Sequence, residues 1–295
     1  MAKANDEEDY VARFRNRRRL TYLATTMLTV IIVIASVVFL YPRQTGPPIA
    51  AIVDQLSSSQ LDPLSRHSNS TFVDHAKQLL QTRFLRVDYF SDNATVDNYR
   101  SLSAYKLIIW RAHSALDLDS EYVAISTSER YGTANYDRYL ENGQLTLCNI
   151  TGDPNLYFAI TPTFVREIMN GRFQDTVIIL MSCNGLKQGY KTAESFIEKG
   201  AKAFTSWDGW IDKTDNDNAI SSMLDYLVTE NNTISEAVSK IRTYVSPIYG
   251  PSTLRFYPIE ASDYRIPDYS QDNVTKGSTL QTMAILKKTE STRLC

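Results

Sequence analysis

The chain has 295 residues, with 31 Lys and Arg residues against 33 Asp and Glu residues and a net charge of -2 at pH 7. Such a balanced charge gives no electrostatic basis for binding nucleic acid. With 43% hydrophobic and 22% charged residues, a disordered chain and a membrane protein with many spans are excluded. Three cysteines are too few for a disulfide-rich scaffold.

The N-terminal part contains one long apolar segment, residues 20–41, which carries no charge. At about 1.5 Å per residue a helix of this length reaches ~33 Å, enough to cross a hydrocarbon core of ~30 Å. Five arginines precede it: Arg13, Arg15, Arg17, Arg18 and Arg19. The positive-inside rule therefore predicts a transmembrane signal anchor in the lipid bilayer of the cell membrane, with the basic segment 1–19 in the cytoplasm and the C-terminal domain outside. A cleaved signal peptide is the alternative, although its apolar region usually has only ~7–15 residues.

The remaining chain divides into three predicted parts. Residues 42–70 are rich in Pro, Gly, Gln and Ser, which is typical of a stalk or linker with at most a short helix around residues 49–56. Residues 71–262 alternate apolar runs of strand length with helical periodicity, which predicts an α/β domain with a mostly parallel sheet. Residues 263–295 lose this pattern and predict a C-terminal extension or tail. The expected helices are 72–81, 96–102, 162–169, 192–199, 218–229 and 235–244, and the expected strands are 85–90, 106–110, 122–126, 145–148, 176–181 and 203–207.

Two of the most apolar strands end in residues that can carry chemistry. The run KLIIW (106–110) leads to His113, and the run TVIILM (176–181) leads to Cys183. If these strands are neighbours, both side chains face one crevice, because functional groups in parallel sheets collect at the carboxyl ends of strands. An imidazole beside a thiol accepts its proton and yields a nucleophilic thiolate, the minimum arrangement for acyl transfer. The backbone N–H groups of Ser114 and Cys183 are the candidate oxyanion donors. Simple packing roles for Cys183 and His113 remain the alternative.

With these residues in view, the chain resembles the caspase-like fold of clan CD cysteine peptidases, most closely the gingipain-like and CHAT branches. The resemblance covers roughly residues 85–245 and includes the motifs RAHSA, VIILMSCNGL and GAKAF, in the order that the family has them. It implies a three-layer αβα sandwich with His113 as general base and Cys183 as nucleophile. It also implies a peptide or protein substrate and no cofactor. The family usually has Gly after the catalytic His, where this chain has Ser114.

The same family places specificity residues on the loop after the 203–207 strand, where this chain has Asp208 and Asp212. Either carboxylate would accept a basic side chain of the substrate through a charge-assisted hydrogen bond. The alternative is that this Asp- and Asn-rich loop forms turns or the N-cap of the next helix. It lacks the regular D-x-D-x-D-G pattern of a calcium loop, so no metal is expected.

The predicted location outside the cell has two further consequences. Five Asn-X-Ser/Thr sequons follow the apolar segment and weakly indicate a glycoprotein, and they begin at Asn69, Asn93, Asn149, Asn231 and Asn273. Cys148 and Cys295 are able to pair there, which would leave Cys183 free. The sequence therefore predicts a membrane-anchored extracytoplasmic cysteine peptidase with a Cys–His dyad. A catalytically inactive caspase-like module that binds peptides or envelope proteins is the alternative.

Overall fold

The structure is a computed structural model, and it describes residues 26–27, 29–30, 47–187 and 190–270. The chain divides into two compact units, Met1–Thr45 and Gly46–Cys295. The fold described below is that of the second unit.

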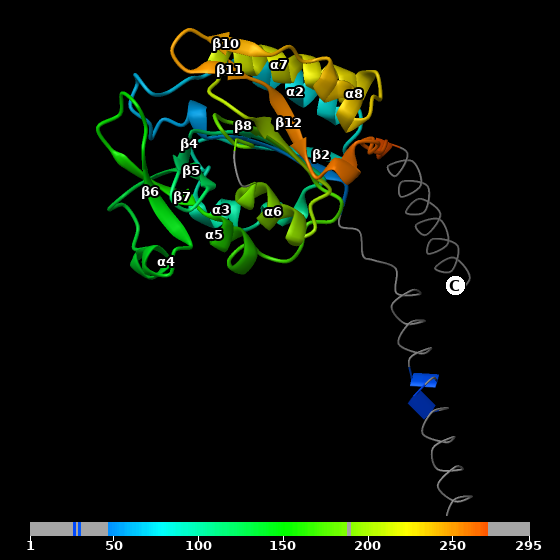
Figure 1. Cartoon of the computed structure of the whole chain (residues 1–295), viewed down its shortest axis with the longest axis horizontal. Coiled ribbons are helices and arrows are strands. Elements are labelled where there is room, and N and C mark those ends of the chain that lie inside the picture. Colours follow the sequence, from blue (N-terminus) through cyan, green and yellow to red (C-terminus); the bar gives the residue numbers. More distant parts are fainter. Residues whose placement is uncertain (1–25, 28, 31–46, 188–189, 271–295) are drawn as a thin grey trace, which may run out of the picture. The chain divides into compact units, whose positions relative to one another are not determined.

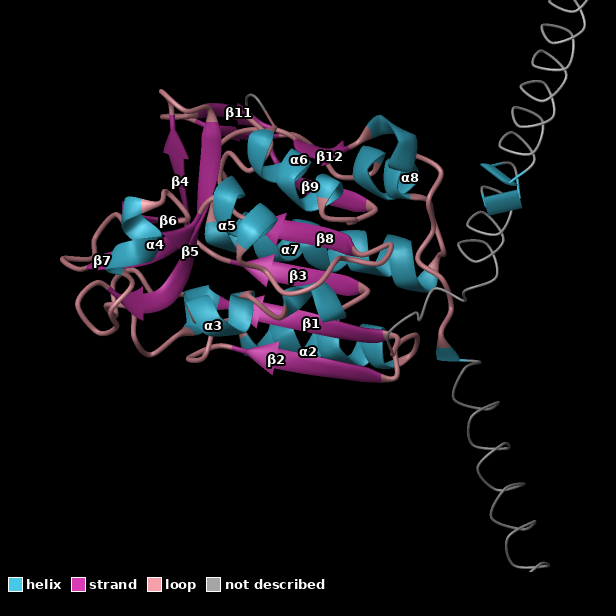
Figure 2. Cartoon of the chain, turned by 90° about the horizontal axis from the view of Figure 1, so that it is seen from below, coloured by secondary structure: helices cyan, strands magenta, loops and turns pink. Residues whose placement is uncertain are grey.

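The main sheet has six strands in the order β12-β9-β8-β3-β1-β2 (Figure 2). All neighbouring pairs are parallel except the edge strand β12, which is antiparallel to β9. The bounds are β1 Ile49–Asp54, β2 Arg86–Phe90, β3 Leu107–Arg111, β8 Val177–Met181, β9 Ala203–Trp207 and β12 Leu254–Tyr257. Every residue of β1, β3, β8 and β9 is buried, which explains why these strands are apolar on both faces.

Helices cover both faces of this sheet (Figure 1). One face carries α2 (Ser70–Gln81), α7 (Lys213–Leu224) and α8 (Ile234–Ser239), and the other carries α3 (Val96–Tyr99), α5 (Pro162–Glu167) and α6 (Lys191–Glu198). Each face has its own hydrophobic cluster, because successive strand residues point to opposite sides. Five of these helices begin with a side-chain cap, which is Asn69, Thr95, Thr161, Asp212 or Thr233.

A second, antiparallel sheet has four strands in the order β4-β5-β7-β6. Its strands are β4 Ser114–Asp117, β5 Tyr122–Arg130, β6 Leu145–Asn149 and β7 Leu156–Ile160, with α4 (Asp137–Glu141) between β5 and β6. Figure 2 shows this sheet beyond the carboxyl ends of β1, β3 and β8. A hairpin of β10 (Tyr244–Ser246) and β11 (Gly250–Ser252) precedes β12. Short 3-10 helices cover Gln55–Ser57, Leu102–Ala104 and Ile259–Ala261, and a π-helix covers Asp225–Thr229.

The predicted architecture, a mostly parallel αβα sandwich preceded by one transmembrane helix, is corrected in two respects. The main sheet is mixed, and a separate antiparallel sheet and a hairpin accompany it. In addition, no helix among the described residues is long and apolar enough to cross a membrane. Nearly all of segment 20–41, on which that helix was predicted, lies outside the described residues. The mixed character escaped prediction because β12 is a four-residue edge strand with the exposed Arg255 in its middle.

The predicted stalk, residues 42–70, is also corrected. Its residues 49–54 form β1, which lies inside the main sheet between β3 and β2. The apolar run IAAIV is short and lies among Pro- and Ser-rich residues, so it was predicted as at most a short helix rather than a strand. The predicted C-terminal extension begins as part of the domain, because Ile266 is buried in a hydrophobic cluster. Residues 271–295 lie outside the described residues.

Candidate active site

His113 and Cys183 follow adjacent strands at the same edge of the main sheet. β3 pairs with β8 in parallel, and the last pair in register is Arg111 with Met181. His113 lies two residues after Arg111, and Cys183 lies two residues after Met181. The hydroxyl of Ser114 donates to the carbonyl oxygen of Cys183 over 2.6 Å and so ties the two strand ends together. The two strands are therefore neighbours, as the predicted crevice required.

Two hydrogen bonds fix the orientation of His113. Its backbone N–H donates to Oε1 of the buried Gln55 over 3.0 Å, and its ring Nε2 lies 3.3 Å from the carbonyl oxygen of Ser65. A carbonyl oxygen only accepts, so this contact requires the proton on Nε2 and leaves Nδ1 as the acceptor of the neutral ring. Burial lowers the pKa of His113 to about 4. The ring is therefore neutral at pH 7, with Nδ1 able to accept a proton.

The Ser65 carbonyl that orients His113 is itself held in place. It also accepts a hydrogen bond from Lys213 Nζ over 2.9 Å, and the Ser65 hydroxyl donates to Asp153 over 2.8 Å. Asp153 lies between β6 and β7, and its carboxylate also accepts a hydrogen bond from the backbone N–H of Asp62. The segment predicted as a stalk thus passes over the site and supplies one of its fixed polar groups.

The thiol of Cys183 is partly buried and contacts the backbone of Ile211. The Ile211 N–H donates to Sγ over 3.5 Å, and Sγ lies 3.6 Å from the Ile211 carbonyl oxygen. Burial raises the pKa of the Cys183 thiol, although the Ile211 N–H acts in the opposite direction. The resting sulfur is therefore a thiol, and a nucleophilic role requires a base at the moment of reaction.

The turn after Cys183 is tightly constrained. Asn184 has a positive φ of 58°, and its N–H donates to the carbonyl oxygen of Gly209 over 2.8 Å. A Cβ on Gly185 would lie 2.7 Å from Cβ of Ser206 in β9, closer than real Cβ atoms approach. Glycine at 185 is thus required by the close approach of β9, and it allows the chain to turn directly after the thiol.

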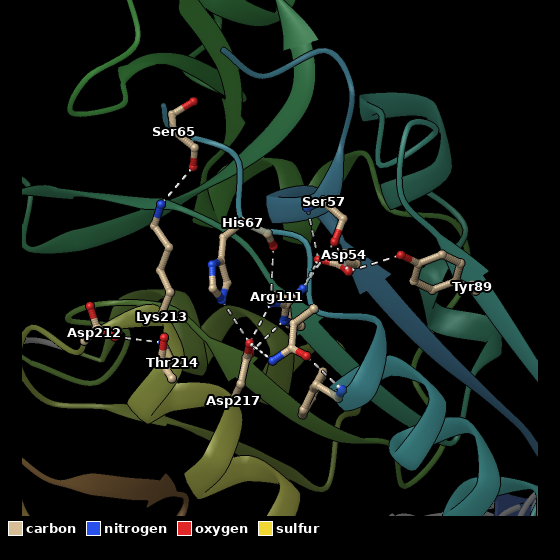
Figure 3. Close-up of polar contacts among 12 residues, drawn as sticks. Asp54, Ser57, Ser65, His67, Tyr89, Arg111, Asp212, Lys213, Thr214 and Asp217 are labelled. Carbon is tan, nitrogen blue, oxygen red and sulfur yellow. Dashed lines mark hydrogen bonds and ion pairs between the residues drawn. The ribbon is translucent and has the colours of Figure 1, made fainter. Parts of the chain in front are cut away.

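A buried ionic network lies at the carboxyl ends of β1 and β3 (Figure 3). The side chain of Arg111 is fully buried, and its Nη1 donates to Asp54 at the end of β1. Its Nε and Nη2 bind both oxygens of Asp217 on α7, each over 2.9 Å. Asp217 also accepts from Asn69 Nδ2 over 2.8 Å and lies 3.2 Å from His67 Nε2. The network therefore joins β1, β3, α7 and the segment that carries Ser65.

The two predicted specificity residues have structural partners. Asp208 accepts the N–H of Thr253 over 2.7 Å and pairs with Arg255 Nε over 2.8 Å, which links the end of β9 to β12. Asp212 is the N-cap of α7 and accepts the N–H of Thr214 over 2.8 Å. The alternative of a capping loop thus describes Asp212 correctly. Of the two, Asp212 also lines a pocket of about 580 Å³ between residues 210–215 and 242–249.

The other predicted residues contribute little to this site. Cys148 is buried in β6 and its thiol contacts the Ser126 hydroxyl, whereas Cys295 lies outside the described residues. In the part of the chain that the structure describes, no group of three or more His, Cys, Asp or Glu side chains is placed to hold a metal ion. Among the sequons, the Asn69 amide is engaged by Asp217, and Asn273 lies outside the described residues.

No protein-family model matches the chain, and no curated protein matches its sequence. An α/β fold by itself does not identify the caspase-like family, because one fold serves many unrelated functions. The resemblance therefore depends on the motifs around His113 and Cys183 and on their order in the chain.

Several residues that shape the site are not among the predicted site residues, namely Asp54, Gln55, Ser65, Arg111, Lys213 and Asp217. The sequence contains one signal that could have revealed the buried ionic network. Arg111 ends an otherwise apolar buried strand, and a buried arginine requires carboxylate partners. Those partners are 57 and 106 positions away in the sequence, so their identity depends on the fold.

Proposed function

We propose that this protein is a caspase-like cysteine peptidase that hydrolyses peptide bonds with Cys183 as nucleophile and His113 as general base. The observation that carries the proposal is the position of both residues just beyond adjacent parallel strands, joined by the hydrogen bond from Ser114 to the Cys183 carbonyl. The fixed orientation of the His113 ring by the Ser65 carbonyl supports it, since a dyad base needs a third group to orient it.

The reaction follows from these protonation states. His113 Nδ1 accepts the Cys183 proton as the sulfur attacks the carbonyl carbon of the substrate, and backbone N–H groups at Ser114 and Cys183 receive the oxyanion. The imidazolium then protonates the leaving amine, which departs and leaves a thioester on Cys183. Water, deprotonated by His113, hydrolyses the thioester and restores the thiol. Burial and the nearby Lys213 disfavour the imidazolium, so the proton moves with the attack rather than before it.

Substitutions of the dyad test the proposal. The protein is incubated with a mixture of unlabelled peptides of varied sequence, and cleavage products are identified by mass spectrometry. Cys183→Ala and His113→Ala are each expected to lower cleavage at least ~100-fold, the usual contribution of a nucleophile or general base. Cys148→Ala is the matched control, because Cys148 is a buried thiol away from the strand ends. Undiminished cleavage by Cys183→Ala would overturn the proposal.

A second candidate is a catalytically inactive module that binds peptides at the same strand ends. The specific observation in its favour is the raised pKa of Cys183, whose sulfur contacts the Ile211 backbone. Iodoacetamide labelling separates the two candidates. In a module without a dyad, iodoacetamide should label Cys183 at the same rate in the natural protein and in His113→Ala. Such a module should also bind peptides without cleaving them.

A further inference from the structure

We propose that the pocket between residues 210–215 and the β10–β11 hairpin binds a large apolar or aromatic side chain of the substrate peptide. This inference rests on the proposed function and names the substrate class of the same site. The pocket has a volume of about 580 Å³, within the range of ~300–1,000 Å³ that ligand pockets show.

The pocket adjoins the candidate nucleophile through a single residue. Ile211 lines it, and the backbone N and O of Ile211 lie 3.5 and 3.6 Å from Cys183 Sγ. A peptide whose scissile carbonyl lies at Sγ carries its nearest side chain on the Cα that is bonded directly to that carbonyl carbon. That side chain is therefore the part of the substrate closest to the pocket.

The pocket presents apolar side chains to solvent. Ile248, Val245 and Tyr249 on the hairpin are 81%, 74% and 61% exposed, and Trp210 on the opposite wall is 36% exposed. The rings of Trp210 and Tyr249 lie 4.9 Å apart between centroids. Clustered exposed apolar residues in a concavity are typical of a binding site, because an apolar occupant removes them from water.

Two of the three charged groups of the lining are already engaged within the protein. Asp212 caps α7, and the Arg242 guanidinium lies 4.6 Å from the centroid of the Tyr244 ring. Asp215 occupies the first turn of α7, where the helix dipole stabilises a negative charge. Asp208, the other predicted acceptor of a basic side chain, is paired with Arg255. Apart from the Asp215 carboxylate, the uncommitted surface of the pocket is thus apolar, which favours an apolar occupant over a basic one.

Labelling with peptide electrophiles tests the inference on the full chain. Peptidyl acyloxymethyl ketones with Phe, Leu, Lys or Asp next to the reactive group are compared by the rate at which intact mass shows modification of Cys183. The Phe and Leu reagents are expected to react ~10-fold or more faster than the Lys and Asp reagents. Ile248→Ser and Tyr249→Ala are expected to slow the Phe reagent by a similar factor and leave the iodoacetamide rate unchanged.

Controls separate this inference from the proposed function. Leu118→Ser changes another exposed apolar residue, 72% exposed, in the β4–β5 turn, and should leave every rate unchanged. Equal rates for all four reagents would overturn the inference. A preference for Lys that Asp215→Asn removes would also overturn it and identify a basic substrate. If instead His113→Ala fails to slow any peptide reagent, the proposed function itself fails, whatever the preference.

Discussion

At the scale of single residues, Arg111 is the side chain whose loss should cost most. It is buried between Asp54 and Asp217, whose side chains are also buried. Removing one partner of a buried ionic group leaves uncompensated charge, so Arg111→Met is expected to lower the free energy of unfolding by about 3–5 kcal/mol in urea denaturation. Arg86→Met, which removes an exposed pair with Asp88, should cost at most about 1 kcal/mol. Similar losses for both variants would contradict this account of the network.

The burial of His113 in its neutral form predicts that the stability of the protein depends on pH. Its folded-state pKa of about 4 lies below the ordinary value of 6.5, so the unfolded chain binds more protons between these pH values. The free energy of unfolding should therefore fall as the pH is lowered from 6.5 to 4, with a slope from this group of at most about 1.4 kcal/mol per pH unit.

His113→Gln removes that contribution, and urea denaturation across this range should show a shallower slope for the variant. Above pH 7 the two proteins should differ by a constant amount. Equal slopes below pH 6.5 would show that His113 is not buried in its neutral form.

At the scale of secondary-structure elements, Asp208 joins β9 to the edge strand β12. Asp208→Ala removes its bonds to the Thr253 N–H and to Arg255, and we expect a loss of about 1–3 kcal/mol in thermal or urea unfolding. The relative rates of the Phe and Lys electrophiles should not change, because this carboxylate is engaged by β12. An altered preference at undiminished stability would instead restore Asp208 as a specificity residue.

The elements that the sequence predicts well are those with strong local signals. β3 and β8 appear as apolar runs whose bounds differ from the prediction by one residue, and α5 follows the Thr161-Pro162 start signal. β1, β4, β7, β10, β11 and β12 were missed. The last three have only three or four residues and are partly exposed, so their pairing depends on distant partners rather than on their own composition.

At the scale of the whole molecule, the position of β1 predicts which part of the chain folds. Gly46–Cys295 forms one compact unit, and β1 lies between β3 and β2 with all six residues buried. A chain that begins at Gly46 should therefore unfold cooperatively in urea, monitored by tryptophan fluorescence. A chain that begins at Thr71, where the domain was predicted to start, should not. Cooperative unfolding of the shorter chain would show that β1 is dispensable.

The sequence by itself determined the α/β character of the domain, its most apolar strands, and the placement of His113 and Cys183 just after two of them. These features depend on local hydrophobic runs, which burial on both faces of a parallel sheet requires. Only the tertiary structure decided that the segment predicted as a stalk supplies β1 and the Ser65 carbonyl, and that Arg111 binds Asp54 and Asp217. Hydrogen bonds and ion pairs of this kind join residues far apart in the chain. No local pattern encodes such contacts, because the strand order of the sheet brings the partners together.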